Sequence, residues 1–312
     1  MAIMRTLRRA VFAAALATTC LSALSAQATT VALVTINQQA LFFNQINDGA
    51  KEAADKAGAQ LVIFNANNQA SAQNSAIEDY IAQKVDGIVL VAIDVNGVKP
   101  AISAAKKAGI PVVAIDARIP DGDNAAFIGV DNTGAGEDIG KFFADYVKND
   151  MGGSTKVGIV GALNSFIQNQ RLDGFKKGAA SAGVKFVDTV DGQNIQDVAL
   201  TAAENLMTAN PDMTAIYATG EPALVGAVSA VTSQKRTDKV KVFGWDLTAQ
   251  VVKGIDEGWI VAVVQQDPYK EGAAGVDTIL KLKKGEKVTA NIDIPVTIVT
   301  KKNVDKFRGL FK

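Results

Sequence analysis

Short apolar runs alternate with longer amphipathic stretches along most of this chain. Most runs are nearly continuous in Val, Ile, Leu and Ala, which is typical of strands buried on both faces of a parallel sheet. Segments of helix length separate the runs, so the pattern predicts repeated strand–helix–strand units. The expected strands are 31–36, 60–66, 87–93, 111–116, 127–131, 156–161, 184–190, 215–220, 240–246 and 260–266.

The segment between the first two expected strands has an apolar stripe at helical spacing. The stripe predicts a helix with one face packed on a sheet, and Gly58 is expected to end that helix. The members of the stripe are Phe43, Ile46, Ala50, Ala53 and Ala57.

Ten strands exceed one sheet of about five or six, and the pattern changes near residue 120. A polar loop over 118–124 takes the place of a helix, and a short fifth strand follows it. We interpret this point as the end of one α/β lobe and the start of a second. The helix expected over 269–284 and the strand expected over 292–299 return to the first lobe. Two doubly wound lobes with more than one crossing connection predict a hinged cleft.

The first 28 residues have the pattern of a secretory signal peptide. Arg5, Arg8 and Arg9 precede an apolar run over 10–24, and a small-x-small sequence ends at Ala28. The run is shorter than the roughly twenty residues of a spanning helix, although a retained anchor is the alternative. Cys20 lies in a poor context for lipid attachment. We therefore expect cleavage of residues 1–28 and export to the periplasm.

The expected mature chain carries few reactive groups. It has no histidine, and the one cysteine of the chain, Cys20, belongs to the leader. This composition excludes Ser–His–Asp and Cys–His catalysis and any His or Cys metal ligand, and it leaves open a site made of carboxylates. We predict no metal and no cofactor. Without the three leader arginines, 29 basic side chains face 32 acidic ones, a net charge of −3, so nucleic acid is not an expected partner.

Polar side chains follow most of the expected strands, at the sheet edge where open parallel sheets bind ligands. Carboxylates and amides dominate this set, and both hydrogen-bond hydroxyl groups well. Phe42 lies off the helix stripe, so its ring could pack on the C–H face of a sugar. The candidate ligand-binding residues are Asn37, Phe42, Phe43, Asp94, Asp116, Arg118, Asn169, Asn194, Glu221, Asp246 and Gln266.

Several of these positions also have a purely structural interpretation. Phe43 fits the core stripe, and Asp94 could cap a helix or a turn. Arg171 is expected mainly to anchor the turn before its helix. Asp116 and Asp246 follow buried strands at equivalent places in the two lobes, so ligand contact is favoured for both.

Five segments of the chain, in order and at family spacing, resemble the periplasmic sugar-binding proteins of ABC importers, of the ribose-binding type. The resemblance covers residues 30 to 300. It implies the periplasmic binding protein type 1 fold, in which three hinge strands join the two lobes. The N-terminal lobe would comprise residues 29–131 plus 267–294, and the C-terminal lobe would comprise residues 132–266 plus 295–312. The resemblance also implies that Phe42, Asp116, Asp246 and Gln266 contact the ligand. The five segments read ALV…FF…DGA from Ala32, PVVAID from Pro111, RLDGF from Arg171, VFGWD from Val242 and QQDP from Gln265.

The chain departs from the ribose-binding pattern at several ligand positions. Ala117 stands where an arginine follows the first-lobe aspartate, and Asn169 stands at a second arginine position. Asn194 replaces an aromatic residue, and Gly220 replaces an asparagine and is followed by Glu221. The pocket therefore loses basic groups and gains acids. We hypothesise that the ligand is a different monosaccharide, a polyol or an amine-bearing sugar, because a buried carboxylate needs a donor.

The leading hypothesis is capture without catalysis. A sugar or polyol would bind between the lobes, favour the closed form and be delivered to an ABC permease, with a chemoreceptor as a further partner. Uptake or sensing of a small polyhydroxy quorum signal is an alternative. Glycoside hydrolysis by Asp116 and Asp246 is a second, although no nucleophile turn or phosphate loop is found. A sugar-sensing gene regulator is a third, and no basic DNA-reading segment supports it.

Overall fold

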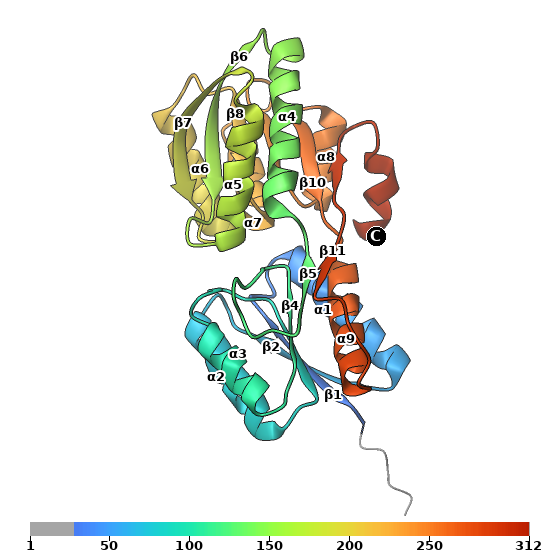
Figure 1. Cartoon of the computed structure of the whole chain (residues 1–312). Helices are drawn as coiled ribbons and strands as arrows, with labels where there is room; N and C mark the ends of the chain where they lie inside the picture. The colour runs from blue at the N-terminus through green and yellow to red at the C-terminus, as the bar shows by residue number, and fades with distance from the viewer. Residues whose placement is uncertain (1–27, 312) are drawn as a thin grey trace, which may run out of the picture.

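Two α/β lobes lie end to end in the computed structural model (Figure 1), which describes residues 28–311. The expected signal peptide falls outside the described residues except for Ala28. Each lobe contains a six-stranded sheet between two layers of helices. Within residues 28–311, no helix has the length and apolar character needed to cross a membrane. The predicted fold class, with two doubly wound lobes, is confirmed.

The first lobe has the strand order β11-β5-β4-β3-β1-β2, with every neighbouring pair parallel. Its strands are β1 (Thr30–Thr35), β2 (Gln60–Asn65), β3 (Gly87–Leu90), β4 (Val112–Ile115), β5 (Ala126–Gly129) and β11 (Asn291–Asp293). Helices α1 (Leu41–Ala57) and α9 (Pro268–Lys283) cover one face of the sheet, and α2 (Ala70–Gln83) and α3 (Lys99–Lys107) cover the other.

The second lobe repeats this order as β12-β10-β9-β8-β6-β7, with only β12 antiparallel among its described strands. Its strands are β6 (Ser154–Gly161), β7 (Gly183–Asp191), β8 (Ala215–Ala218), β9 (Lys241–Trp245), β10 (Ile260–Gln265) and β12 (Thr297–Val299). One face is covered by α4 (Asn132–Asp150) and α5 (Phe166–Ala179). The other is covered by α6 (Gln196–Ala209), α7 (Glu221–Ser233), α8 (Ala249–Glu257) and the 3₁₀ helix η1 (Val304–Phe311).

The ten expected strands are all present, and α1 ends at Gly58, whose φ of 64° is the left-handed conformation that glycine adopts easily. The single strand expected over 292–299 is wrong. That segment forms β11 in the first sheet and β12 in the second. Pro295 lies between them and has no N–H to donate to a ladder, so the chain leaves one sheet there and joins the other.

The chain passes between the sheets three times, after β5, after β10 and after β11. The pass after β10 leads directly into α9, which packs on α1 through glycines at Gly272 and Gly49. A Cβ at either glycine would overlap a backbone carbonyl of the other helix. Gly136 and Gly174 bring α4 and α5 together in the same way. These contacts fix the first turns of α1 and α5, which both point at the space between the lobes.

Candidate ligand-binding site

A cavity lies between the lobes, at the carboxyl ends of both sheets. Its volume is about 40 Å³. The loops after β1 and β4 and the start of α1 line it from the first lobe. The second lobe contributes the starts of α5 and α7 and the loops after β7, β9 and β10. The lining residues are Ile36, Ala40, Phe42, Phe43, Asp116, Ser165, Ile167, Gln168, Arg171, Asn194, Gly220, Glu221, Pro222, Asp246 and Gln266.

Asp116 and Asp246 occupy equivalent positions in the two lobes. Each directly follows a buried strand, β4 or β9, and has a positive φ, 60° for Asp116 and 67° for Asp246. Aspartate is one of the few side chains that tolerate this conformation. Each donates its backbone N–H to the neighbouring strand, at Ile128 (2.9 Å) and Val264 (2.8 Å). The chain therefore turns at the same point in each lobe and exposes a carboxylate to the cavity.

Arg171 is the cation of the site and is only 3% exposed. Its Nε donates to Asn132 Oδ1 at 2.7 Å, and Nη1 donates to the Thr219 carbonyl at 3.2 Å. Its Nη2 donates to Gln266 Oε1 at 3.0 Å. These bonds tie α5 to the start of α4, the end of β8 and the crossing after β10, so Arg171 holds together the second-lobe side of the cavity.

The Arg171 guanidinium lies over an aromatic ring and near two carboxylates. Its central carbon is 3.9 Å from the centre of the Trp245 ring, a favourable cation–π geometry. Nη2 is 4.0 Å from Asp116 Oδ1, beyond hydrogen-bonding distance. Gln266 connects Arg171 to the second carboxylate, because it accepts a bond from Arg171 and its Nε2 donates to both oxygens of Asp246, at 3.1 and 3.0 Å.

Burial shifts the acids of the site away from their ionised forms. It raises the pKa of Asp116 and of Asp246 to about 6, against the opposing effect of Arg171. It also raises the pKa of Glu221 to about 7, although two backbone N–H groups favour the ionised form. Glu271, in the first turn of α9, is fully buried, and burial together with the nearby Asp116 raises its pKa well above the ordinary value.

Glu221 connects the two lobes directly. It is the first residue of α7, and its two carboxylate oxygens accept the backbone N–H groups of Leu41 (2.9 Å) and Phe42 (2.7 Å) at the start of α1. The residue that precedes α1, Ala40, offers no side-chain cap. A carboxylate is favoured at a helix N-terminus, because the first backbone N–H groups lack acceptors and the positive end of the helix dipole lies there. The second lobe thus caps a helix of the first.

Glu221→Gln is expected to weaken this contact between the lobes. Glutamine offers one carbonyl oxygen, and its NH₂ group would face an N–H that needs an acceptor. Small-angle X-ray scattering without ligand should then show a larger radius of gyration than the parent protein has. Glu78→Gln, on the exposed surface of α2, is the matched control. Identical scattering from Glu221→Gln and the parent would contradict the role of Glu221.

Stability should depend on pH through Asp116. Its pKa in the folded state is above the ordinary 3.8, so its contribution to stability is present below about pH 4 and is lost as the pH rises through about 6. Asp116→Asn removes the cost of burying the charge. The variant should therefore gain on the order of 2 kcal/mol over the parent at pH 8 and lose this advantage toward pH 4.5, as measured by urea unfolding.

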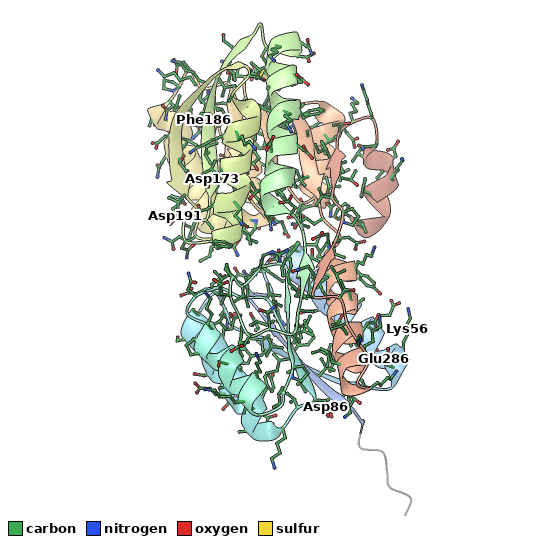
Figure 2. The ribbon with its side chains drawn as sticks, viewed as in Figure 1. Lys56, Asp86, Asp173, Phe186, Asp191 and Glu286 are labelled. Carbon is green, nitrogen blue, oxygen red and sulfur yellow. The ribbon has the colours of Figure 1, made fainter. Side chains whose placement is uncertain are left out.

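The control for that measurement is Asp173→Asn, because Asp173 lies exposed on α5 outside the cavity (Figure 2). The free energy of unfolding of Asp173→Asn should equal that of the parent protein at every pH. A difference between Asp116→Asn and the parent that grows as the pH falls would contradict the expected sign.

The cavity brings together seven of the eleven expected ligand-binding residues. Phe42 and Phe43 meet edge to face, with ring centres 5.3 Å apart, and Asn194 Oδ1 accepts a bond from Gln168 at 3.0 Å. Ligand contact by these residues stays a prediction. The seven are Phe42, Phe43, Asp116, Asn194, Glu221, Asp246 and Gln266.

Two other expected residues of the first lobe lie outside the lining and stabilise turns. Asn37 is buried, and its Oδ1 accepts the backbone N–H groups of Gln39 (3.1 Å) and Ala40 (3.2 Å) before α1. Asp94 is exposed and accepts the N–H groups two and three residues later, both at 2.9 Å. Asp94 therefore has the turn role that was its structural alternative.

Arg118 and Asn169 also lie outside the cavity lining. Arg118 is exposed, donates to Asn291 at 2.5 Å and lies 4.2 Å from the centre of the Phe127 ring. Asn169 donates to the Leu163 carbonyl at 2.9 Å and closes the loop before α5. Both side chains satisfy local backbone or surface groups, which explains why they do not reach the site.

Sequence reasoning missed the importance of the first turns of α5. Gln168 is buried, and its Oε1 accepts the Ala162 N–H (3.0 Å) and the Thr219 hydroxyl (2.7 Å). Ile167 packs against the core of the first lobe. A second cavity of about 50 Å³ lies next to the first, because both are lined by Ile36, Ser165, Ile167 and Asn194. The available signal was the position of this helix directly after an expected strand.

A two-lobed α/β protein with a cavity lined by hydrogen-bonding groups from both lobes is a clamshell binding protein in its architecture. Among residues 28–311, no group of three or more Asp, Glu, His or Cys side chains is placed to hold a metal ion. Residues 31–287 match the family model described as periplasmic binding protein domain, and the chain belongs to this family. The resemblance seen in the sequence is confirmed.

Individual relatives are similar over most of their length. The ribose import binding protein RbsB of Escherichia coli (strain K12) is 29% identical over 273 residues, 87% of this chain and 90% of RbsB. A carbohydrate transporter solute-binding protein from Agrobacterium radiobacter, solved with D-arabinose, has a TM-score of 0.85 and 26% identity over 92% of this chain and 100% of its own. An ABC transporter solute-binding protein from Mycobacterium smegmatis, solved with glycerol, has a TM-score of 0.83 and 30% identity. The match covers 89% of this chain and 96% of that protein.

Proposed function

We propose that this protein is the substrate-binding protein of an ABC importer, which captures a monosaccharide or a related polyol between its lobes. The observation that carries the proposal is that Asp116 and Asp246, from equivalent points of the two lobes, line the same cavity. A ligand that bonds to both carboxylates contacts both lobes only when they are closed. Its binding free energy therefore favours the closed form.

The chemistry of the lining suits a ligand rich in hydroxyl groups. Carboxylate oxygens accept hydrogen bonds from hydroxyl groups, and amides both donate and accept. Phe42 and Phe43 add an apolar wall on the first-lobe side, which can cover the C–H face of a sugar ring. The named relatives, a ribose import protein and a protein solved with D-arabinose, support the same class of ligand.

Entry of a sugar requires the lobes to separate. The space of about 40 Å³ between them is too small for a sugar ring, since one water molecule already needs roughly 10–15 Å³ of such space. Separation breaks the bonds from Glu221 to α1 and removes Ile167 from the first lobe. The two cavities, which share Ile36 and Ile167 in their linings, would then open into one larger site.

The place of action and the partners are part of the proposal. The relatives are transporter binding proteins by name, which supports action outside the cytoplasm, and the leader expected over residues 1–28 would direct the chain to the periplasm. The closed form would dock on a membrane permease and release the ligand unchanged. Docking on a chemoreceptor stays a prediction from the sequence.

A thermal-shift screen of the mature protein against monosaccharides and polyols tests the proposal. A ligand at a hundredfold excess over its Kd adds roughly 2.7 kcal/mol to the free energy of unfolding, so a clear rise in Tm is expected for at least one compound. Isothermal titration should then give one site per chain. Turnover of a glycoside by the purified protein, or no response to any sugar or polyol, would contradict the proposal.

A further inference from the structure

The ionisable side chains that line the cavity are strongly unbalanced. Asp116, Glu221 and Asp246 are acidic, and Arg171 is the one basic side chain among the lining residues. All four are nine-tenths or more buried. With every group ionised, the lining has a net charge of −2, and water is largely excluded from it.

Arg171 has little left to offer a ligand. Three of its N–H donors are bonded to Asn132, Thr219 and Gln266, and one face of its guanidinium lies on Trp245. Arg171 lines the cavity and neutralises part of its charge. The charged groups that a ligand meets in the cavity are therefore mainly acceptors.

Among the three carboxylates that line the cavity, Asp116 is the one without a hydrogen-bond donor. It is 2% exposed and lines the cavity. Its nearest cation, Arg171, is 4.0 Å away, beyond hydrogen-bonding distance, and within residues 28–311 no hydrogen bond to its carboxylate is found. A buried carboxylate without a donor is costly, so this side chain points to a missing donor in the cavity.

A fourth acid, Glu271, lies near Asp116. Glu271 is completely buried, and neither of its carboxyl oxygens has a hydrogen-bond partner in the described part of the chain. It interacts electrostatically with both Asp116 and Asp246. Any negative charge on this group makes a cation in the cavity more favourable.

We infer that the cavity selects a cationic member of the proposed ligand class, a sugar or polyol with a protonated primary amine placed against Asp116. This inference rests on the proposed function and narrows it. An ammonium group has three donors and no acceptor, which matches a lining that holds three carboxylates and one cation that is already bonded to the protein. A hydroxyl group supplies one donor and no charge, so a neutral sugar would satisfy acceptors but leave the negative charge of the lining in place.

Titration calorimetry with matched pairs tests the inference at pH 6.5, where the amines are protonated. The probes are D-glucosamine, D-galactosamine, D-mannosamine and an aminodeoxyinositol, each beside the parent compound with a hydroxyl group and beside its N-acetyl form. At least one amine should bind 100-fold or more tightly than its hydroxyl partner, and acetylation should remove the gain. Asp116→Asn should weaken amine binding at least tenfold, while Asp173→Asn leaves it unchanged.

Two other outcomes separate this inference from the proposed function. If a neutral sugar binds and its amine partner binds equally or more weakly, the inference is wrong and the proposed function stands. If neither the amines nor the neutral compounds bind, both are wrong. If amines bind but Asp116→Asn retains the full preference, the amine is not held by Asp116 and the inference also fails.

Discussion

Arg171→Ala should lower the free energy of unfolding by about 3–5 kcal/mol, because removal of one partner from a buried set of charges leaves the others uncompensated. The substitution also takes away donors from Asn132, Thr219 and Gln266 and the cation that lies on Trp245. Urea unfolding at pH 8, where Asp116 and Asp246 are ionised, measures the loss.

A double variant separates charge from packing in that experiment. In Arg171→Ala with Asp116→Asn, one of the uncompensated carboxylates is gone, so the combined loss should be smaller than the sum of the two single effects. Arg308→Ala is the surface control. Arg308 pairs with Asp256 and Asp305 in exposed positions, where ion pairs contribute little. An Arg171→Ala protein as stable as Arg308→Ala would contradict the central role of Arg171.

Asp246→Asn should weaken binding of the ligand about 100-fold, since hydrogen bonds to a charged group contribute about 1.5–3 kcal/mol. Asparagine is the suitable replacement because it tolerates the φ of 67° at this position better than alanine does. The folded state should keep or gain stability, because burial raises the pKa of Asp246 and its ionised form is costly. Calorimetry of binding and urea unfolding together test both parts.

The control for Asp246→Asn is again Asp173→Asn, which removes the same charge from an exposed position of the same lobe. Parent-like affinity in Asp246→Asn would show that the ligand does not depend on this carboxylate. A fall in stability together with the loss of binding would show instead that Asp246 supports the fold.

The fold could be predicted because its signal is repeated along the chain. Buried parallel strands need continuous apolar runs, and ten such runs stand at regular spacing. The last segment could not be assigned in the same way. β11 and β12 have three residues each and lie in different sheets, and so short a run does not specify which sheet will take it.

The site was predictable where the position along a strand decides the direction of a side chain. Asp116 and Asp246 follow β4 and β9 directly and reach the cavity. Asp94 also follows a strand, but three intervening residues allow its loop to turn and use the carboxylate locally. Arg171 sits inside α5, ten residues along the chain after the end of β6, so only the packing of α5 on α4 reveals that it faces the cavity.

The cap that Glu221 places on α1 makes two backbone amides a direct measure of lobe separation. When the lobes part, the N–H groups of Leu41 and Phe42 lose their acceptors and become free to exchange their hydrogens with solvent. Protection factors at these two amides therefore report the free energy of opening. Hydrogen exchange at Leu41 and Phe42 can therefore measure the equilibrium between the closed and open forms without a label and without a ligand.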